Sequence, residues 1–297
     1  MLKGLRQLTK SLETRGRRVL MELVTWLFGA RQRPLELGPQ PKVLVVRLDD
    51  RVGNLVLLTP LLATLQARLP RAHIDLVASP RGLLLLEGHP TLQRIIPFIK
   101  KSIFGPTGPL RSIWTVRRER YDLAIDAGNP TQHSTLHGLL VRLSGARHTI
   151  GVTRPSRAQL VSSPVSIPQE ISHEIDLRLA LLAPITGHAT TRQVSIRPLP
   201  KAAVIETFCA AQPGPNALIN IGARLPEKQL SQQAYSHIVT QVAQRGFTPI
   251  LSFGPTEEEL AKNIASSSPG ILAPPTALLE LASLMQACEL VVSCDTG

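Results

Sequence analysis

Two carboxylates and a glycine follow an apolar run near the start of the chain. The run spans residues 43–46, and Asp49, Asp50 and Gly53 come directly after it. A carboxylate at the end of a strand can act as a general base toward a hydroxyl group, and a glycine there permits close backbone approach or a positive φ. The alternative is that neighbouring arginines pair with the carboxylates and brace the turn, and the residue types alone allow both.

A second group of polar residues follows another apolar run, at residues 217–221. Gly222, Ala223, Arg224 and Lys228 lie here, just before a predicted helix. Backbone N–H groups and two cations can hold a diphosphate and stabilise its charge as it leaves. The stretch matches neither GxGxxG nor a P-loop, so a pair of solvated cations beside a turn is an equal alternative.

Glutamates follow a third predicted strand, which spans residues 249–253. Thr256 is a good helix N-cap, and Glu257 and Glu258 suit the positive end of the helix. That structural role explains most of this segment. One of the two glutamates can instead accept hydrogen bonds from the hydroxyl groups of a ribose.

The last predicted strand, residues 290–293, leads into Asp295, Thr296 and Gly297. A hydroxyl group and backbone amides at the start of a helix favour a phosphate. Because no helix follows this turn in the sequence, we expect a chain that is truncated at its C-terminus, with an incomplete second domain.

The cysteines and histidines form no metal-binding pattern. The 3 cysteines lack CxxC spacing, which is typical of a reducing compartment and gives no disulfide framework. His133 and His137 lie four residues apart, but in a polar stretch of small residues. We therefore predict no metal site and no cofactor.

Alternating apolar strands and helices predict an α/β fold of two domains, each with a doubly wound parallel sheet. Pro60 should kink the first helix or reset its start. The predicted strands span residues 43–46, 74–78, 94–98, 122–126, 194–197, 217–221, 249–253 and 290–293. The predicted helices span residues 54–69, 82–86, 110–120, 173–182, 232–245, 257–266 and 278–287.

The domain boundaries follow from this pattern. We place a basic segment at residues 1–33, a first domain at 42–188, a linker region at 189–215 and a second domain at 216–297. Ligands of such sheets bind outside the carboxyl ends of the strands, which is where the polar groups above lie. The cleft between the domains is the expected site.

The chain is strongly basic, with a formal net charge of +12. This charge points to polyanionic partners, but an aromatic content of 3% argues against nucleic-acid binding by base stacking. Residues 1–33 form a basic, amphipathic segment, and its apolar run at 19–28 is too short to span a bilayer. Such a helix suits the surface of an anionic membrane, and packing on the protein's own core is the alternative.

Taken together, these segments resemble glycosyltransferase family nine, the ADP-heptose:lipopolysaccharide heptosyltransferases. The resemblance covers residues 42–297 in the order of the family's motifs. The matching segments are residues 43–60 (VLVVRLDDRVGNLVLLTP), 121–126 (YDLAID), 145–151 (GARHTIG), 173–174 (HE), 222–228 (GARLPEK), 253–257 (FGPTE), 278–281 and 291–297 (VVSCDTG).

The resemblance implies a GT-B fold of two Rossmann-like domains that face a cleft. It implies that the first domain engages an inner-core lipopolysaccharide acceptor and that the second binds an ADP-sugar. Transfer would invert the anomeric carbon without a metal, at the cytoplasmic face of the bacterial inner membrane. Lys228 and the loop from Gly222 would bind phosphates, the turn from Asp295 would hold the diphosphate, and Glu257 or Glu258 would bind the ribose.

One departure from the family concerns the base. The family has an aspartate after the glycine that Gly53 matches, whereas this sequence has Asn54, and an amide does not accept a proton at neutral pH. We expect Asp50, or else Asp49, to take the role. One alternative is a catalytically impaired member that only binds nucleotide sugar or lipopolysaccharide precursor. Another is a nucleic-acid-binding protein, which only the positive net charge supports.

Overall fold

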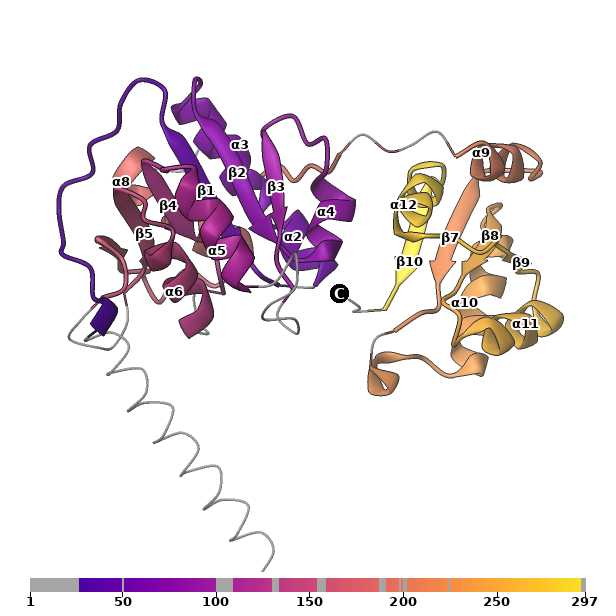
Figure 1. The fold of residues 1–297 in the computed structure, drawn as a ribbon. Helices are drawn as coiled ribbons and strands as arrows, with labels where there is room; N and C mark the ends of the chain where they lie inside the picture. The colour runs from indigo at the N-terminus through magenta and orange to yellow at the C-terminus, as the bar shows by residue number, and fades with distance from the viewer. Residues whose placement is uncertain are drawn as a thin grey trace, which may run out of the picture. The chain divides into compact units, whose positions relative to one another are not determined.

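The computed structural model describes residues 27–49, 51–99, 109–129, 134–153, 159–186, 191–197, 199, 202–223 and 225–294. The chain divides into two compact units, Met1–Arg197 and Pro198–Gly297. Figure 1 shows strands and helices alternating within each unit. In the part of the chain described, no helix is both long and apolar enough to cross a membrane.

The first unit is built on a parallel sheet in the order β3-β2-β1-β4-β5-β6. Its strands are β1 (Lys42–Arg47), β2 (His73–Ala78), β3 (Arg94–Pro97), β4 (Leu123–Asp126), β5 (His148–Val152) and β6 (Ser163–Val165). Its helices are α2 (Val52–Val56), α3 (Thr59–Arg68), α4 (Pro80–Leu86), α5 (Pro109–Arg118), α6 (Thr135–Leu143), α7 (Glu174–Ala180) and α8 (Ala183–Thr186). The strand order reverses between β1 and β4.

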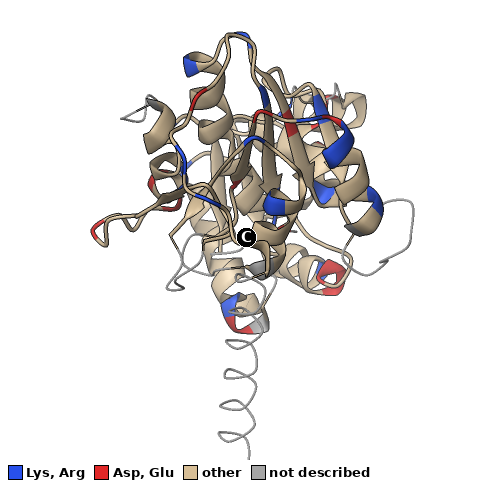
Figure 2. Ribbon diagram, turned by 60° about the vertical axis from the view of Figure 1, so that its left-hand side comes forward, with Lys and Arg blue, Asp and Glu red and all other residues tan. Residues whose placement is uncertain are grey.

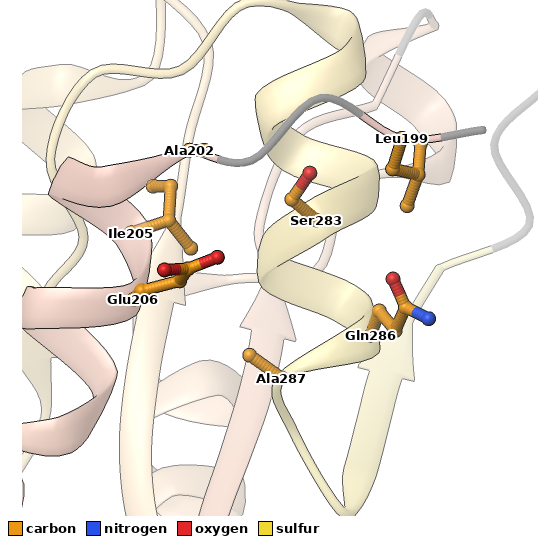
Figure 3. Close-up of a pocket in the computed structure, with 7 residues that line it drawn as sticks. All are labelled: Leu199, Ala202, Ile205, Glu206, Ser283, Gln286 and Ala287. Carbon is orange, nitrogen blue, oxygen red and sulfur yellow. The ribbon is translucent and has the colours of Figure 1, made fainter.

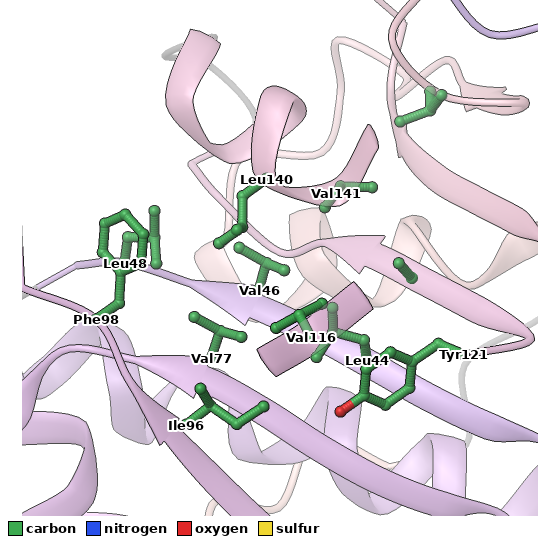
Figure 4. Packing of buried hydrophobic residues seen from close by; sticks show 12 residues of the cluster. Leu44, Val46, Leu48, Val77, Ile96, Phe98, Val116, Tyr121, Leu140 and Val141 are labelled. Atoms are coloured by element: carbon green, nitrogen blue, oxygen red, sulfur yellow. The ribbon is translucent and has the colours of Figure 1, made fainter. Parts of the chain in front are cut away.

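Strand β1 is buried on both faces, as its continuous apolar sequence predicts. Alternate residues of a strand point to opposite faces of the sheet, so Leu44 and Val46 pack on the face that α5 and α6 cover (Figure 4). Val116 from α5 and Leu140 from α6 lie in the same cluster. The core of this unit therefore holds the carboxyl end of β1 in a fixed position.

The second unit has a parallel sheet in the order β10-β7-β8-β9. Its strands are β7 (Asn216–Asn220), β8 (Thr248–Ser252), β9 (Ile271–Leu272) and β10 (Leu290–Ser293). Its helices are α9 (Ala203–Ala210), α10 (Gln232–Gln244), α11 (Glu258–Ser267) and α12 (Leu278–Gln286), with a short 3-10 helix at Pro226–Lys228. One core lies between the sheet and the α10–α11 pair, and a second lies between the sheet and the α9–α12 pair.

Most of the predicted elements are present, and Pro60 resets the helix start as expected. Helix α2 ends at Val56, and a new helix, α3, begins at Thr59 with Pro60 in its first turn. Elements that the sequence analysis did not predict are α6, α8, α9, β5, β6 and β9.

Two expectations were wrong. Residues 194–197 form no strand, because their backbone bonds to other groups: Ser195 N–H donates to Thr59 Oγ1 over 2.8 Å and Arg197 N–H to the Leu85 carbonyl over 3.2 Å. The second domain also begins before residue 216. Helix α9 lies in the expected linker region, but its Ile205 and Cys209 are buried in the core of the second unit.

Candidate active site

The carboxylate of Asp49 is held by three donors just past the end of β1. Arg47 Nη2 donates to Asp49 Oδ2 over 3.0 Å, and the Arg51 N–H donates to Oδ1 over 2.9 Å. The Asn54 amide donates to Oδ2 as well. The bracing network that the sequence left open as an alternative is therefore present around Asp49.

These donors set the charge state of Asp49. Burial alone would raise the pKa of its carboxyl group, but the hydrogen bonds from Arg51 and Asn54 and the charge of Arg47 outweigh burial and hold the pKa below its ordinary value. Asp49 is an anion at neutral pH. A carboxylate whose pKa is lowered binds a proton less readily, so it is a weaker general base.

Arg47 joins the two central strands of the first sheet at the point where the strand order reverses. Its side chain is 1% exposed, and Nη1 donates to the carbonyl of Ala127, after β4, over 2.7 Å. Burial, and then the charge of Arg178, lower the pKa of Arg47 to about 10. The guanidinium remains charged at neutral pH, and it fixes the loop that carries Asp49.

Two further buried side chains lie near this loop. His137, one of the histidine pair considered above, accepts a hydrogen bond through Nε2 from the Leu48 N–H over 2.9 Å. Arg178 of α7 pairs with Glu174 over 2.7 Å. The sequence analysis assigned Arg178 no role and considered His137 only as a metal ligand, because both residues lie far along the chain from Asp49. The charge of Arg178 acts on Arg47 and Asp49.

Gly53 does not adopt a positive φ. It lies inside helix α2 and is not among the glycines with positive φ, so that part of the expectation was wrong. A Cβ atom built there would meet no atom of the protein within 4 Å, and close approach of a substrate to this backbone stays a prediction.

The second unit has a pocket of about 220 Å³ at the carboxyl ends of β7 and β10. The order of this sheet reverses between those two strands, which is where ligands bind in doubly wound sheets. Lys228 is exposed and lines the pocket, together with Asn220 and Ser293 at the ends of the two strands. The remaining lining residues are Leu230, Tyr235, Ile238, Val292 and Cys294.

Hydrogen bonds fix the wall of this pocket. Asn220 donates to Ser293 Oγ over 3.3 Å and accepts from Ser252 Oγ over 3.3 Å, so it ties together the ends of β7, β8 and β10. The hydroxyl of Tyr235 donates to the carbonyl of Ile221 over 3.3 Å and lies 3.1 Å from Cys294 Sγ. Burial raises the pKa of Tyr235 to about 12, and the hydroxyl stays neutral.

The loop after β8 differs in detail from the expectation. Helix α11 begins at Glu258 and its N-cap position is Glu257, so Thr256 is not the cap. The Glu257 carboxylate folds back over Gly254, since a Cβ atom at Gly254 would lie 2.6 Å from Glu257 Oε2. Glu258 pairs with Lys262 over 2.8 Å at the surface. Glu257 is thus the glutamate that stays near the end of β8.

Several predicted site residues lie outside the described residues, namely Asp50, Arg224, Asp295, Thr296 and Gly297. Gly222 and Ala223 are described and follow the buried Ile221 at the end of β7. Within the described ranges, no three His, Cys, Asp or Glu side chains lie close enough together to share a metal ion.

A second pocket, of about 270 Å³, lies between α9 and α12 (Figure 3). It contains one carboxylate, from Glu206, and the side chains of Ser283 and Gln286 among apolar groups. None of its lining residues comes from the loops after β7, β8 or β10. It therefore does not belong to the site at the strand ends.

A model of glycosyltransferase family 9 (heptosyltransferase) matches residues 110–297. This match covers more than half of the chain, so the chain belongs to glycosyltransferase family 9. It is accordingly a glycosyltransferase enzyme, as the resemblance of its sequence to this family implies.

Individual relatives are distant. The chain is 22% identical to lipopolysaccharide heptosyltransferase 3 of Escherichia coli over 269 residues, which cover 82% of this chain and 75% of the relative. The protein of the same name from strain K12 is 24% identical over 233 residues, which cover 70% of this chain and 62% of the relative.

Solved structures share the fold. The family 9 glycosyl transferase of Veillonella parvula DSM 2008 matches with a TM-score of 0.70 at 19% identity, covering 89% of this chain and 77% of that one. Escherichia coli heptosyltransferase WaaC with ADP-2-deoxy-2-fluoro heptose matches with a TM-score of 0.65 at 22% identity, covering 86% and 83%. The predicted GT-B type of fold, with Rossmann-like domains, is confirmed.

Proposed function

We propose that this enzyme transfers a heptose, or a related sugar, from an ADP-sugar to an inner-core lipopolysaccharide acceptor. The observation that carries the proposal is the pocket at the ends of β7 and β10 in a family 9 chain, with Lys228 at its edge. The relatives support the sugar and the acceptor class: two are lipopolysaccharide heptosyltransferases, and WaaC binds ADP-2-deoxy-2-fluoro heptose.

In this proposal the second unit binds the donor. Lys228 and Arg224 pair with the diphosphate, and the backbone N–H groups of Gly222 and Ala223 donate to it. Asp295, Thr296 and Gly297 contribute to binding of the same group. Glu257 accepts hydrogen bonds from the ribose hydroxyls, because its carboxylate lies near the end of β8 while Glu258 pairs with Lys262.

The first unit supplies the general base. The base removes a proton from an acceptor hydroxyl, the oxygen attacks the anomeric carbon from the side opposite the diphosphate, and the bond to the diphosphate oxygen breaks. ADP leaves and the anomeric configuration inverts. The positive charges of Lys228 and Arg224 stabilise the leaving diphosphate, so we propose that neither a metal nor another cofactor takes part.

We assign the base to Asp50. Asn54 cannot accept a proton, and Asp49 is held by three donors that lower its pKa. Asp49 then orients the loop, with Arg47 as its charged partner.

The test is Asp50→Asn. We expect this variant to lose sugar transfer while it keeps ADP binding, measured as ligand-induced thermal stabilisation. Transfer by the unaltered protein should persist in the presence of a metal chelator. Full activity of the variant would rule out Asp50 as the base.

A second function is favoured by one observation, the Asn54 amide that donates to Asp49 where an unhindered base is expected. The chain would then bind a nucleotide sugar or a lipopolysaccharide precursor without transferring a sugar. Product formation from ADP-heptose and a deep-core acceptor separates the two functions. Stabilisation by an oligonucleotide in place of ADP would contradict both.

We also propose a location at the inner face of the bacterial inner membrane, attached as a peripheral protein. The support is the net charge of +12 and the basic, amphipathic sequence of residues 1–33. Residues 1–26 lie outside the described residues.

A further inference from the structure

Helix α5 carries a basic and apolar outer face. Leu110 is 52% exposed and Trp114 is 54% exposed, and Arg118 continues the same line at a spacing of four residues. Residues four apart lie on one side of a helix. Arg111 and Arg117 are also exposed and flank this line. The outer face of α5 therefore consists of these five residues, three of them cationic.

The cations of this face have no acidic partner among the residues that the structure describes. The Arg118 guanidinium lies over the Trp114 ring, 3.6 Å from its centroid, and Arg117 donates to the Leu143 carbonyl over 3.4 Å. The neighbouring carboxylate, Glu119, is instead paired with Arg94 and Lys42. Among the described residues, no carboxylate neutralises the positive charge of this face.

The inner face of α5 already has its packing partners. Val116 is fully buried in the core beneath the helix, and Ser112 donates to the Pro97 carbonyl over 3.1 Å. Leu110 and Trp114 are left outside that core. Leu110 and Trp114 lie one helical turn apart, so their exposed side chains adjoin, and adjoining exposed apolar groups can mark a contact surface.

The neighbour of α5, helix α6, contacts the first described residues of the chain. Helix α6 contacts α5, and its Arg142 donates to the Phe28 carbonyl over 2.9 Å. Leu27 and Phe28 are 58% and 39% exposed. Leu27 and Phe28 belong to the basic segment 1–33, so the described end of that segment is attached to the neighbour of α5. Lys and Arg, blue in Figure 2, are spread along the described ribbon.

We propose that the outer face of α5 is a docking surface for an anionic lipid bilayer. Tryptophan prefers the interface between lipid and water, and arginines near an anionic membrane are attracted to its surface potential. The inference deepens the peripheral attachment proposed above by naming a folded surface for it. It does not depend on which sugar is transferred.

The experiment uses Trp114 as a reporter. In a Trp26→Phe background Trp114 is the remaining tryptophan of the chain. Vesicles of equal parts phosphatidylcholine and phosphatidylglycerol should shift its emission to shorter wavelength, and vesicles of phosphatidylcholine alone should not. Unchanged Trp114 emission, while the protein still sediments with the anionic vesicles, would overturn the proposal.

A matched pair of variants tests the charge. Arg111→Gln with Arg118→Gln should lower vesicle binding on the order of tenfold. Arg68→Gln with Arg71→Gln, which removes the same charge from exposed positions at the end of α3 and after it, should change binding much less. Equal losses would mean that net charge and not this face governs attachment, and would overturn the proposal.

ADP-induced thermal stabilisation and Trp114 emission together separate the test of membrane docking from the test of the proposed function. Each variant should keep ADP-induced thermal stabilisation, because α5 belongs to the first unit and the donor pocket to the second. A shift of Trp114 emission by an oligonucleotide but not by anionic vesicles would overturn membrane docking in favour of nucleic acid. If the unaltered protein does not bind ADP, the proposed function is contradicted. The vesicle experiment would still test membrane docking, because it does not depend on ADP.

Discussion

At the scale of single residues, Asp49 and Asn54 illustrate how neighbours determine what a carboxylate can do. Asp49 has the residue type of a general base, but it accepts from Arg47, the Arg51 N–H and Asn54. These interactions favour the charged form and make proton uptake harder. The carboxylate of Asp49 therefore has a structural role in the loop, which is why we assign the base to Asp50.

Lys228 is the residue on which donor binding depends most in our proposal. Replacing it by alanine should weaken ADP binding roughly tenfold to a hundredfold, since a hydrogen bond to a charged group contributes about 1.5–3 kcal/mol. Isothermal titration with ADP measures this loss. Lys228→Arg should recover part of the affinity, whereas Arg245→Ala, at an exposed cation after α10, should bind as the unaltered protein does. Normal affinity of Lys228→Ala would exclude the assignment.

At the scale of elements, residues 191–197 are bound to the first unit by few but well-defined contacts. Ser195 bonds to Thr59 of α3 through its backbone, and its hydroxyl lies 3.0 Å from Nε2 of the buried His89. Arg197 bonds to α4 at Leu85. These contacts are made by polar groups at irregular spacing, so no periodicity in the sequence reports them.

His89 should make this attachment sensitive to pH. Burial lowers the pKa of His89 below its ordinary value, so below about pH 6.5 the unfolded chain takes up a proton more readily than the folded one. Stability is therefore fully present above that pH and declines as the pH falls. Urea unfolding at about pH 7 and about pH 5 should show a smaller acid-induced loss for His89→Gln than for the unaltered protein.

The matched control for this prediction is His237→Gln, at an exposed histidine of α10. It should lose as much stability on acidification as the unaltered protein. An identical loss in His89→Gln and in the unaltered protein would contradict the role of His89.

The sequence predicted the long buried elements well and the short ones poorly. Short continuous apolar runs rich in β-branched residues, such as the one in β1, favour strands buried on both faces, and they were found. Helix α9 and strand β9 were not predicted, because α9 lies in a segment taken for a linker and β9 has only two residues. Of the site, the strand-end loops were found, but the hydrogen bond of His137 to Leu48 and the nearness of Arg178 to Asp49 were not, since only the tertiary fold brings these residues to the loop.

At the scale of the whole molecule, each unit has its own sheet and its own hydrophobic cores. We expect two unfolding transitions in calorimetry. Enthalpy of unfolding grows with the number of residues, so the transition of smaller enthalpy belongs to the second unit.

ADP should raise the temperature of that smaller transition, because the donor pocket lies in the second unit. At a hundredfold excess over the dissociation constant, the stabilisation should be about 2.7 kcal/mol. A single transition, or an effect of ADP on the larger transition alone, would contradict this assignment of donor binding.

The central claim is that this family 9 chain transfers a sugar from an ADP-linked donor. The most direct measurement is ADP release together with the mass of a deep-core lipopolysaccharide acceptor after mixing with ADP-heptose. We predict that ADP appears only when the acceptor is present, that the acceptor gains one heptose, and that Asp50→Asn abolishes both. An acceptor whose mass does not change, under conditions in which ADP binds to the protein, would contradict the account.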